Sequence, residues 1–255
     1  MLSVDIIILS YARDSNLRAL TQQAIDTLYA SEDAEKVKFQ TIILESERKL
    51  SPYQYDNTTT IYPKEAFNFN RYLNIGLKAS KSDFICFCNN DIVFFKDWAS
   101  ELLKAMDADK KLLSASPICP KFHPDSEIYP NTGIRYGHEI RKEISGWCFL
   151  VRREIFQQIG LFDENFSFWF ADADYANTLK KYGIKHGLVT SAMVEHLDGR
   201  STIELDSAMK QEMTTEQFWY YQFKWEHRNY FLYSYRRLRS WLRIMTSRFV
   251  LRYKA

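Results

Sequence analysis

Four short apolar runs, separated by stretches with helical spacing, constrain what this chain can fold into. Each run has the length and the β-branched or aromatic content of a buried strand. The runs are Val4–Leu9, Val37–Leu44, Thr58–Tyr62 and Asp83–Cys88. Apolar residues recur every three or four positions in the stretches Leu17–Leu28, Phe67–Ala79 and Trp98–Met106. This alternation predicts an α/β fold, a mostly parallel sheet flanked by helices on both faces.

Polar residues follow three of these runs directly. Ser10 and Tyr11 follow the first run, Glu45 follows the second, and the turn Asn89-Asn90-Asp91 follows the fourth. In open sheets of this kind, ligands bind at the carboxyl ends of the strands. We therefore expect these side chains to converge on one side of the sheet.

The second half of the chain carries another set of polar residues in a fixed order. An apolar run at 146–153 leads into a short helix and then a Gly-Leu-Phe-Asp-Glu turn at 160–164. Asp172 and Asp174 stand just before a helix expected at Tyr175–Lys181, and His196 ends a later strand. This order places an acid, a possible base and a metal-type ligand around one cleft. The turn that contains Asp91 would form the other wall.

Two regions differ from this pattern. Residues 116–143 contain four prolines and are expected to be irregular or to form a hairpin. From Phe218 onward, one apolar stripe has helical spacing, which predicts a long amphipathic helix or a pair of helices. Its members are Phe231, Tyr235, Leu238, Leu242, Met245 and Phe249. We therefore expect a catalytic domain over residues 1–217 and a basic amphipathic helical C-terminal extension over residues 218–255.

Composition narrows the class of protein further. The 255 residues are 46% hydrophobic, which is enough for a substantial core, and no apolar run approaches the roughly 20 residues that span a bilayer. The four cysteines form no Cys-x-x-Cys pair, and with no recognisable signal peptide they indicate reduced thiols and a cytoplasmic protein. Residues 224–255 carry a net charge of +8, whereas the rest of the chain carries −6.

In this order, the motifs resemble those of the inverting family 2 glycosyltransferases, which have the GT-A fold. The resemblance runs from about Ser3 to Ser201. It rests on the opening strand and turn at 4–11, the second strand and its acid at 41–46, the segments 67–69 and 74–76, the turn at Asp91, and the segment 172–196. It implies transfer of a sugar from a nucleoside-diphosphate sugar to an acceptor hydroxyl with inversion. Many relatives act in bacterial surface polysaccharide or glycolipid synthesis.

The resemblance also implies a divalent cation, Mn²⁺ or Mg²⁺, on the diphosphate. Asp91 matches the last acid of the family's Asp-x-Asp motif, and Asn89 stands where the first acid usually is. His196 matches a late metal-binding histidine. One imidazole among oxygen ligands would favour Mn²⁺ somewhat.

On the acceptor side, Asp172 is the expected general base, a carboxylate that takes the proton of the attacking hydroxyl. The family usually has Glu before this Asp, and here the position is Ala171. Asp174 is expected on the acceptor side, or as a cap of the following helix. Trp147 would stack on a sugar face, or else belong to the core.

On the donor side, the resemblance gives a larger set of residues. Glu45 replaces the usual Asp that recognises the base or ribose, and Arg13 would pair either with a phosphate or with Asp14. The donor-binding residues expected are Ser10, Tyr11, Arg13, Glu45, Asn74, Asn89, Asn90, Asp91, Arg200 and Ser201. The expected donor is a UDP- or dTDP-linked sugar, and the expected acceptor is a glycan or a lipid-linked acceptor.

Alternatives remain for the activity and for the tail. Asn89 and Ala171 leave room for a catalytically inactive GT-A-like nucleotide-sugar-binding or scaffold protein. The apolar stripe, with the basic residues beside it, would lie on an anionic membrane at the inner face of the plasma membrane, pack on the catalytic domain, or form a homodimer. No nucleic-acid partner is expected, because no recognised nucleic-acid-binding module is present.

Overall fold

A computed structural model describes residues 2–197 and 207–240, with side chains in the second segment described from Thr214 onward. Two compact units divide the chain, residues 1–204 and residues 205–255. The helix that opens the second unit runs across residues 217 and 218, between which the sequence placed the boundary of the C-terminal extension. The two units are described separately.

The first unit is built on one sheet whose strands follow the order β3-β2-β1-β4-β8-β6-β9-β5, with β7 paired to β9. The strands are β1 (Leu2–Ser10), β2 (Val37–Glu45), β3 (Thr58–Ile61), β4 (Phe84–Asn89), β5 (Ile92–Phe94), β6 (Leu112–Ile118), β7 (Ile134–Tyr136), β8 (Cys148–Arg152) and β9 (Lys185–His196). Strands β5, β7 and β8 oppose their neighbours, and the other strands run in one direction. The expected mostly parallel α/β sheet is confirmed.

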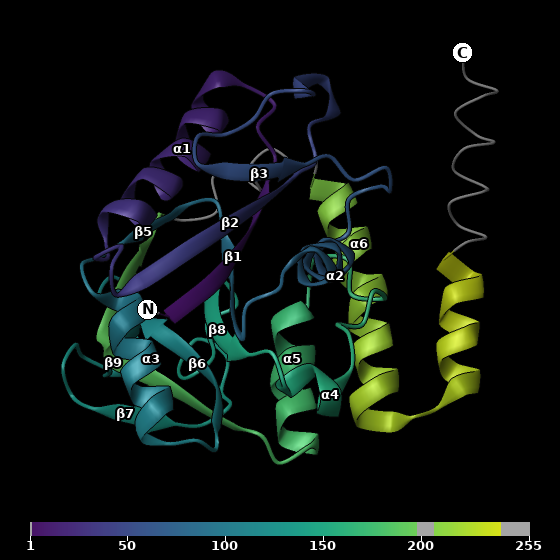
Figure 1. Ribbon diagram of the computed structural model, residues 1–255. Coiled ribbons are helices and arrows are strands. Elements are labelled where there is room, and N and C mark those ends of the chain that lie inside the picture. The colour runs from purple at the N-terminus through teal and green to yellow at the C-terminus, as the bar shows by residue number, and fades with distance from the viewer. Residues whose placement is uncertain (1, 198–206, 241–255) are drawn as a thin grey trace. The chain divides into compact units, whose positions relative to one another are not determined.

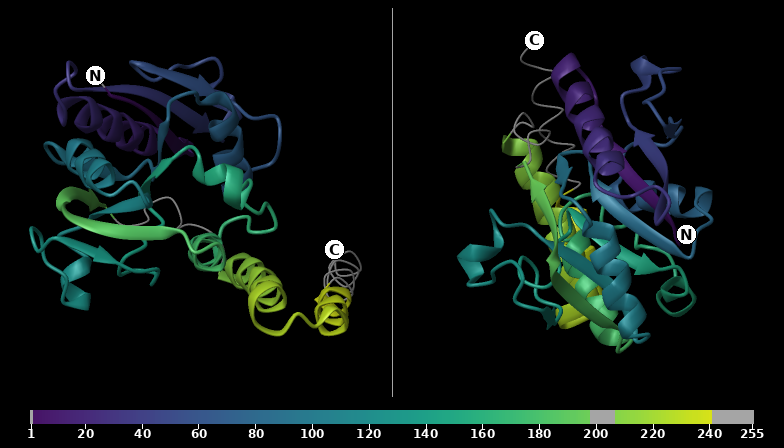
Figure 2. Two further views of the ribbon diagram at one scale, coloured as in Figure 1. Left: turned by 60° about the horizontal axis from the view of Figure 1, so that its bottom comes forward. Right: turned by 60° about the vertical axis from the view of Figure 1, so that its left-hand side comes forward.

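Helices cover both faces of this sheet (Figure 1; Figure 2). The helices are α1 (Ser15–Ala30), α2 (Phe69–Ala79), α3 (Trp98–Ala108), α4 (Ile155–Ile159) and α5 (Ala171–Lys181), with short 3₁₀ turns at Arg48–Leu50 and His123–Ser126. One apolar core joins α1 and α3 to the sheet, and a second core joins α2, α4 and α5 to the opposite face. Strand β1 contributes to both, because Ile6 and Ile8 face the first core while Ile7 and Leu9 face the second.

Two expectations about local structure need correction. Ser116–Ile118 belong to strand β6, because buried Pro117 and Ile118 pair with the neighbouring strand β9, with a register shift between them. Helix α5 begins at Ala171, so Asp172 and Asp174 lie inside its first turn and not before it. Acidic residues are favourable there, because the first turn carries the positive end of the helix dipole.

The second unit contains helix α6 (Ser207–Tyr221), a π-helical segment Gln222–His227, and a further helix over residues 230–240. The chain turns at Arg228, whose φ of 46° is left-handed. Phe223 stacks on Tyr233 with 5.0 Å between ring centroids, and Arg236 donates a hydrogen bond to Gln222, so the two arms contact each other. A pair of helices is therefore the form that the described part of the extension takes (Figure 1).

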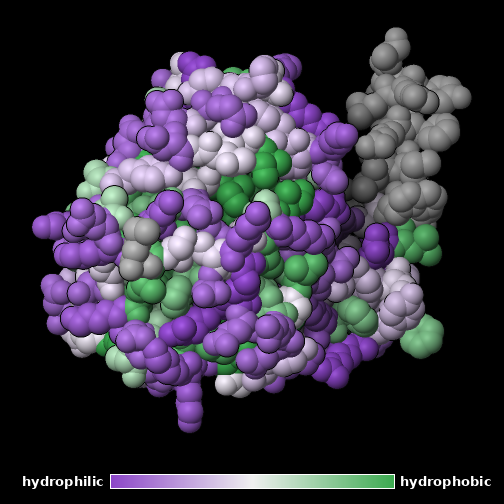
Figure 3. All heavy atoms as spheres, viewed as in Figure 1, coloured by the Kyte–Doolittle hydropathy of each residue, from purple (hydrophilic) through white to green (hydrophobic). Residues whose placement is uncertain are grey.

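Three apolar side chains of the predicted stripe are exposed on the second arm, the helix over residues 230–240. Phe231, Tyr235 and Leu238 are 87%, 60% and 56% exposed. Figure 3 shows hydrophobic residues at the surface of this helix. The other three residues of the predicted stripe, Leu242, Met245 and Phe249, lie outside the described residues. None of the described helices is long and apolar enough to cross a bilayer.

The fold makes a prediction about pH. His186 on β9 is fully buried between Ser114, whose Oγ lies 2.7 Å from Nδ1, and the carbonyl of Glu143, 2.9 Å from Nε2. Burial lowers the pKa of His186 to about 4. Because the unfolded side chain titrates near 6.5, the unfolded chain binds more protons at this residue between these two values. The lowered pKa of His186 makes the free energy of unfolding at neutral pH about 3 kcal/mol larger than at pH 4. This difference is complete above pH 6.5 and is lost as the pH falls towards 4.

Urea unfolding between pH 7 and pH 4 measures this loss. The variant His186→Gln should have a flatter profile over that window than the wild type, whereas the exposed control His227→Gln should follow the wild type. Identical slopes for all three proteins would contradict the assignment.

Candidate active site

A buried polar network joins the carboxyl ends of three neighbouring strands. Residue Ser10 at the end of β1 pairs in register with Glu45 at the end of β2, and its Oγ lies 3.0 Å from Oγ1 of Thr21 on α1. Thr21 in turn accepts a hydrogen bond from Nδ2 of Asn90, just after β4. The hydroxyl of Tyr55 lies 3.3 Å from Ser10 and donates to Glu45 at 3.0 Å. The expected convergence of the strand ends is therefore present.

Glu45 lies behind the loop that follows β1 and not at the surface. It is fully buried, and its Oε1 accepts hydrogen bonds from the backbone N–H groups of Ala12 and Glu47, while Oε2 accepts from Tyr55. Burial raises the pKa of Tyr55, so its hydroxyl keeps the proton that it donates. With both oxygens engaged, Glu45 positions the loop in this structure. Direct contact between Glu45 and a donor base stays a prediction.

Tyr11 and Arg13 form the exposed part of the same loop. Tyr11 is 42% exposed, and the guanidinium of Arg13 lies 5.9 Å from the centre of its ring. Of the two expected partners of Arg13, the structure shows Asp14, at 3.7 Å. Asn89 is half-buried, and its backbone N–H donates to the carbonyl of Trp147. Tyr11 and Arg13 thus directly follow Ser10 of the buried network, and Asn89 lies in register beside Leu9.

Asp91 and His196 meet at the edge of the sheet. Strands β5 and β9 pair antiparallel so that Ile92 lies opposite His196, and the N–H of Leu197 donates to the carbonyl of Asp91. The Oδ1 atom of Asp91 lies 3.3 Å from Nε2 of His196, and both side chains are largely buried. Two ligands separated by many residues in the sequence are therefore adjacent, as the metal hypothesis requires.

This pair fits a divalent cation. Neither Oδ1 of Asp91 nor Nε2 of His196 has a hydrogen-bond partner, although both atoms are buried. Two adjacent ligands of an octahedral ion with bonds near 2.1 Å lie about 3.0 Å apart, close to the observed 3.3 Å. Among the described residues, no three or more His, Cys, Asp or Glu side chains lie close enough together to hold a metal ion. A divalent cation here would take further ligands beyond this pair, such as water or a substrate.

Trp147 packs between the metal pair and the core. Its ring stacks on His196 with 5.1 Å between centroids and an interplanar angle of 7°. The rings of Phe122 and His123 also contact it, at 5.7 and 5.9 Å. The face of Trp147 towards His196 is covered, so a sugar cannot stack on that face, and stacking on the other face stays a prediction. The stacked ring holds the His196 imidazole in place.

Asp172 lies against the backbone of Gly146. A methyl group on Gly146 would lie 2.9 Å from Cβ of Asp172, so glycine permits this close approach. The helix that carries Asp172 starts from Phe170, whose φ of 61° is left-handed and unfavourable for a bulky residue. Asp172 lies against Gly146, and the next residue, Trp147, stacks on His196. The expected base and the Asp91–His196 pair are therefore connected through two consecutive residues. Asp174 is 5% exposed, so it does not present its carboxylate to a large acceptor.

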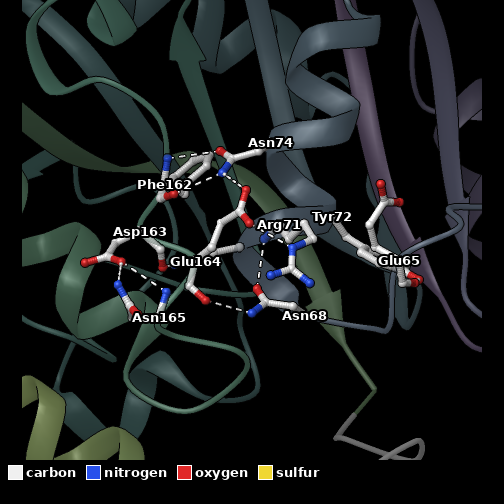
Figure 4. Close-up of polar contacts among 10 residues, drawn as sticks. Glu65, Asn68, Arg71, Tyr72, Asn74, Phe162, Asp163, Glu164 and Asn165 are labelled. Atoms are coloured by element: carbon white, nitrogen blue, oxygen red, sulfur yellow. Dashed lines mark hydrogen bonds and ion pairs between the residues drawn. The ribbon is translucent and has the colours of Figure 1, made fainter.

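Asn74 anchors helix α2 to a neighbouring turn. Figure 4 shows Asn74 and Arg71 pointing from α2 towards the turn at 162–164. Asn74 donates to the carbonyl of Phe162 and accepts from its N–H, and it also donates to Glu164. The Arg71 guanidinium, 2.8 Å from Glu164, holds the pKa of that carboxyl below its usual range. The predicted donor contact of Asn74 finds no support in this geometry, because the side chain is buried and its hydrogen bonds go to this turn.

More bonds from the start of α2 hold the segment that leads to Asp172. The Nδ2 groups of Asn68 and Asn70 donate to the carbonyls of Glu164 and Asp163, and the N–H of Phe69 donates to the carbonyl of Ser167. The turn is thus fixed on the same helix along residues 162–167. Arg200 and Ser201, the last two expected donor contacts, lie outside the described residues.

Several residues of the site were not found from the sequence. Tyr55 stands in an irregular stretch where no spacing marks it as a partner of Glu45. Thr21 gave a usable signal, because it is a polar residue on the buried stripe of α1 between Leu17 and Ala24. Phe122 lies in the proline-rich segment, and nothing in the sequence indicated its contact with Trp147.

Three solved glycosyltransferase structures have a similar fold. GalNAc-T7 with UDP, GalNAc and Mn²⁺ has a TM-score of 0.62 at 12% identity, over 88% of this chain and 50% of that chain. The mannosyltransferase PcManGT of Pyrobaculum calidifontis, with GDP-Man and Mn²⁺, gives 0.56 at 14%, over 85% and 61%. The catalytic domain of Drosophila β1,4-galactosyltransferase 7 with xylobiose gives 0.54 at 17%, over 81% and 75%. The chain spans only about half of GalNAc-T7. The fold is that of the GT-A glycosyltransferases.

The family follows from the sequence match. The family model described as glycosyl transferase family 2 matches residues 5–160, which is more than half of the chain. No curated protein matches the sequence. The chain belongs to glycosyltransferase family 2, and the resemblance read from its motifs is confirmed.

The anchor on α2 gives a prediction about stability. Asn74→Ala would leave the buried N–H and carbonyl of Phe162 without partners, which should lower the free energy of unfolding by about 2–4 kcal/mol. The control Gln157→Ala removes an exposed amide on α4 and should change it by less than about 0.5 kcal/mol. Urea denaturation followed by circular dichroism measures both. Equal midpoints for the two variants would show that the bonds of Asn74 contribute nothing.

Proposed function

We propose that this glycosyltransferase moves a sugar from a nucleoside-diphosphate sugar to an acceptor hydroxyl with inversion, and that Asp172 is the general base. One chain of contacts carries the proposal. The Asp91–His196 pair is stacked against Trp147, and the preceding residue, Gly146, lies against Asp172. Direct displacement needs one carboxylate at the acceptor hydroxyl and no covalent sugar intermediate. Asp172 is partly exposed, and its Oδ1 accepts the neighbouring N–H of Ala173 at 2.8 Å, which fixes the carboxylate.

Asp91 and His196 would hold Mn²⁺ or Mg²⁺. A bound divalent cation would neutralise charge on the leaving diphosphate. Asn89 brings no charge to this place, so Asp91 and His196 would carry the affinity for the cation. The Mn²⁺ in the solved structures of GalNAc-T7 and PcManGT supports a cation at this place.

The donor is proposed to be UDP- or dTDP-linked, and the acceptor a glycan or lipid-linked molecule of surface polysaccharide or glycolipid synthesis. The exposed Tyr11 and the loop held by Glu45 would contact the nucleoside. Structures of GT-A relatives contain UDP in one case and GDP-Man in another, so a donor panel has to include both bases.

A second candidate is a nucleotide-sugar-binding protein without transferase activity. Asn89 and Ala171 favour it, because each stands where the family usually has an acid. The orphaned metal pair and the close fit of Asp172 on Gly146 favour an active enzyme, since binding alone does not require an oriented carboxylate beside the cation pair.

Donor turnover in a panel of nucleotide sugars, with water or added saccharides as acceptors, tests the proposal. Asp172→Asn keeps the shape and removes the basicity, so turnover should fall by roughly 10²-fold or more. Its thermal shift with Mn²⁺ and donor should match the wild type. Asp91→Asn should instead lose the Mn²⁺-dependent part of the shift.

Three results would contradict the proposal. Near-normal turnover in Asp172→Asn would show that Asp172 is not the general base. A product with retained anomeric configuration would exclude direct displacement. Full wild-type turnover in EDTA removes the cation. Donor binding without turnover of any sugar would favour the binding protein.

We also propose that the protein is cytoplasmic and attaches peripherally to the inner face of the plasma membrane through its second unit. Support comes from the exposed Phe231, Tyr235 and Leu238 beside Arg237 and Arg239. Aromatic and basic residues on one helix favour an anionic interface, where each basic residue contributes about 1 kcal/mol.

Co-sedimentation with phosphatidylserine vesicles at low salt measures this attachment. The full chain should pellet, and the triple variant Phe231→Ser, Tyr235→Ser, Leu238→Ser should stay largely in the supernatant. If the wild type also stays in the supernatant, or if light scattering shows that only the wild type dimerises, the stripe serves another contact.

A further inference from the structure

Three unsatisfied polar atoms occur together in the active site. Among the described residues, the buried side-chain atoms without a hydrogen-bond partner are Oδ1 of Asp91, Nε2 of His196, Nε1 of Trp147 and Nε of Arg152. The first three belong to residues in contact, through the Asp91–His196 pair and the stacked Trp147 ring. Buried polar groups are almost always bonded, so such a cluster indicates a ligand of the site.

The three atoms do not ask for the same partner. A carboxylate oxygen and an imidazole nitrogen can both bind a cation. The indole nitrogen of Trp147 is a donor only. A cation cannot satisfy it, and a positive charge close to the N–H would repel the hydrogen. The indole therefore requires an oxygen acceptor in addition to the metal.

Among the residues that the structure describes, no acceptor is placed to supply this bond. The ring is held on one face by His196 and at its edges by Phe122 and His123. The backbone of Trp147 is fixed as well, because its carbonyl accepts the N–H of Asn89 at 2.9 Å. The N–H thus cannot swing to a carbonyl elsewhere without breaking these contacts. A buried donor left unpaired weakens the fold, and a ligand that pairs it gains that energy back on binding.

We infer that the indole N–H of Trp147 donates a hydrogen bond to a diphosphate oxygen of the donor, beside the cation held by Asp91 and His196. This inference rests on the proposed function and deepens it, since it names the group of the substrate that Trp147 recognises. Trp147 is then a binding residue on the donor side, and its role differs from the sugar stacking expected from the sequence. An anionic oxygen suits the N–H, because hydrogen bonds to charged acceptors are the strong ones.

Indole N–H signals report this bond directly. The chain has six tryptophans, so a ¹⁵N-indole spectrum has few peaks, and the variant Trp147→Phe identifies the one from Trp147. If that variant does not fold, traces of Mn²⁺ identify the same peak in the wild type, because the paramagnetic ion broadens the signal nearest to it. The probes are Mg²⁺ alone and then Mg²⁺ with inorganic pyrophosphate, which removes any dependence on the base.

Addition of pyrophosphate to the Mg²⁺-loaded protein should move the Trp147 N–H signal downfield and slow its exchange with solvent. Trp147→Phe should weaken Mg²⁺–pyrophosphate binding by about 10- to 100-fold in titration calorimetry, the range for a bond to a charged group. It should leave the affinity for Mn²⁺ alone unchanged. The matched control is Trp98→Phe, which removes an indole N–H bonded to Ser31 in the core of α3 and should not change pyrophosphate binding.

Two outcomes would overturn the inference while leaving the donor site intact. Pyrophosphate binds but neither the signal nor the affinity of Trp147→Phe changes, or the signal moves fully with Mg²⁺ alone, which would assign the N–H to a water on the cation. If pyrophosphate does not bind to the wild type with Mg²⁺ or Mn²⁺, the proposed donor site itself is wrong, and the inference fails with it.

Discussion

A parallel strand that is buried on both faces has little room for polar side chains along its middle, and this constraint places the chemistry of the protein at the strand ends. Between Ile6 and Leu9, strand β1 faces one apolar core on each side of the sheet. Polarity begins at Ser10, in register with Glu45 and next to Asn89 on the other neighbour. The pairing of the three strands thus fixes the distances between these groups, independently of the conformation of the loops. The loops add detail to a position that the sheet has already set.

The site is ordered by packing on one side and by hydrogen bonds on the other. The imidazole of His196 is held by the flat contact with Trp147, and the loop after β1 is held by the carboxylate of Glu45. The three unpaired atoms around His196 remain under-satisfied in this otherwise fixed surrounding. Preorganised groups of this kind cost little reorganisation when the ligand arrives. A ligand that pairs them also stabilises the folded chain by mass action.

Much of this arrangement could be predicted from the sequence, because it follows from periodicity and chain order. Apolar runs gave the strands, and their polar ends gave Ser10, Glu45 and Asp91. Family motifs brought His196 to Asp91 across more than a hundred residues. What could not be predicted depends on side-chain direction. The length of Glu45 lets it fold back onto the N–H of Ala12, and the face of Trp147 that meets His196 depends on the angle between two strands.

The site is supported from two separate places, and this has a consequence for how the family can diversify. Asp91 directly precedes β5 and His196 ends β9, whereas the segment before Asp172 is tied to α2 through Asn68, Phe69, Asn70 and Asn74. Only Phe168, Trp169 and Phe170 lie between the last of these ties and helix α5, which carries Asp172. The sequence of this short segment can therefore diverge within the family without altering the strand pairing that brings Asp91 next to His196.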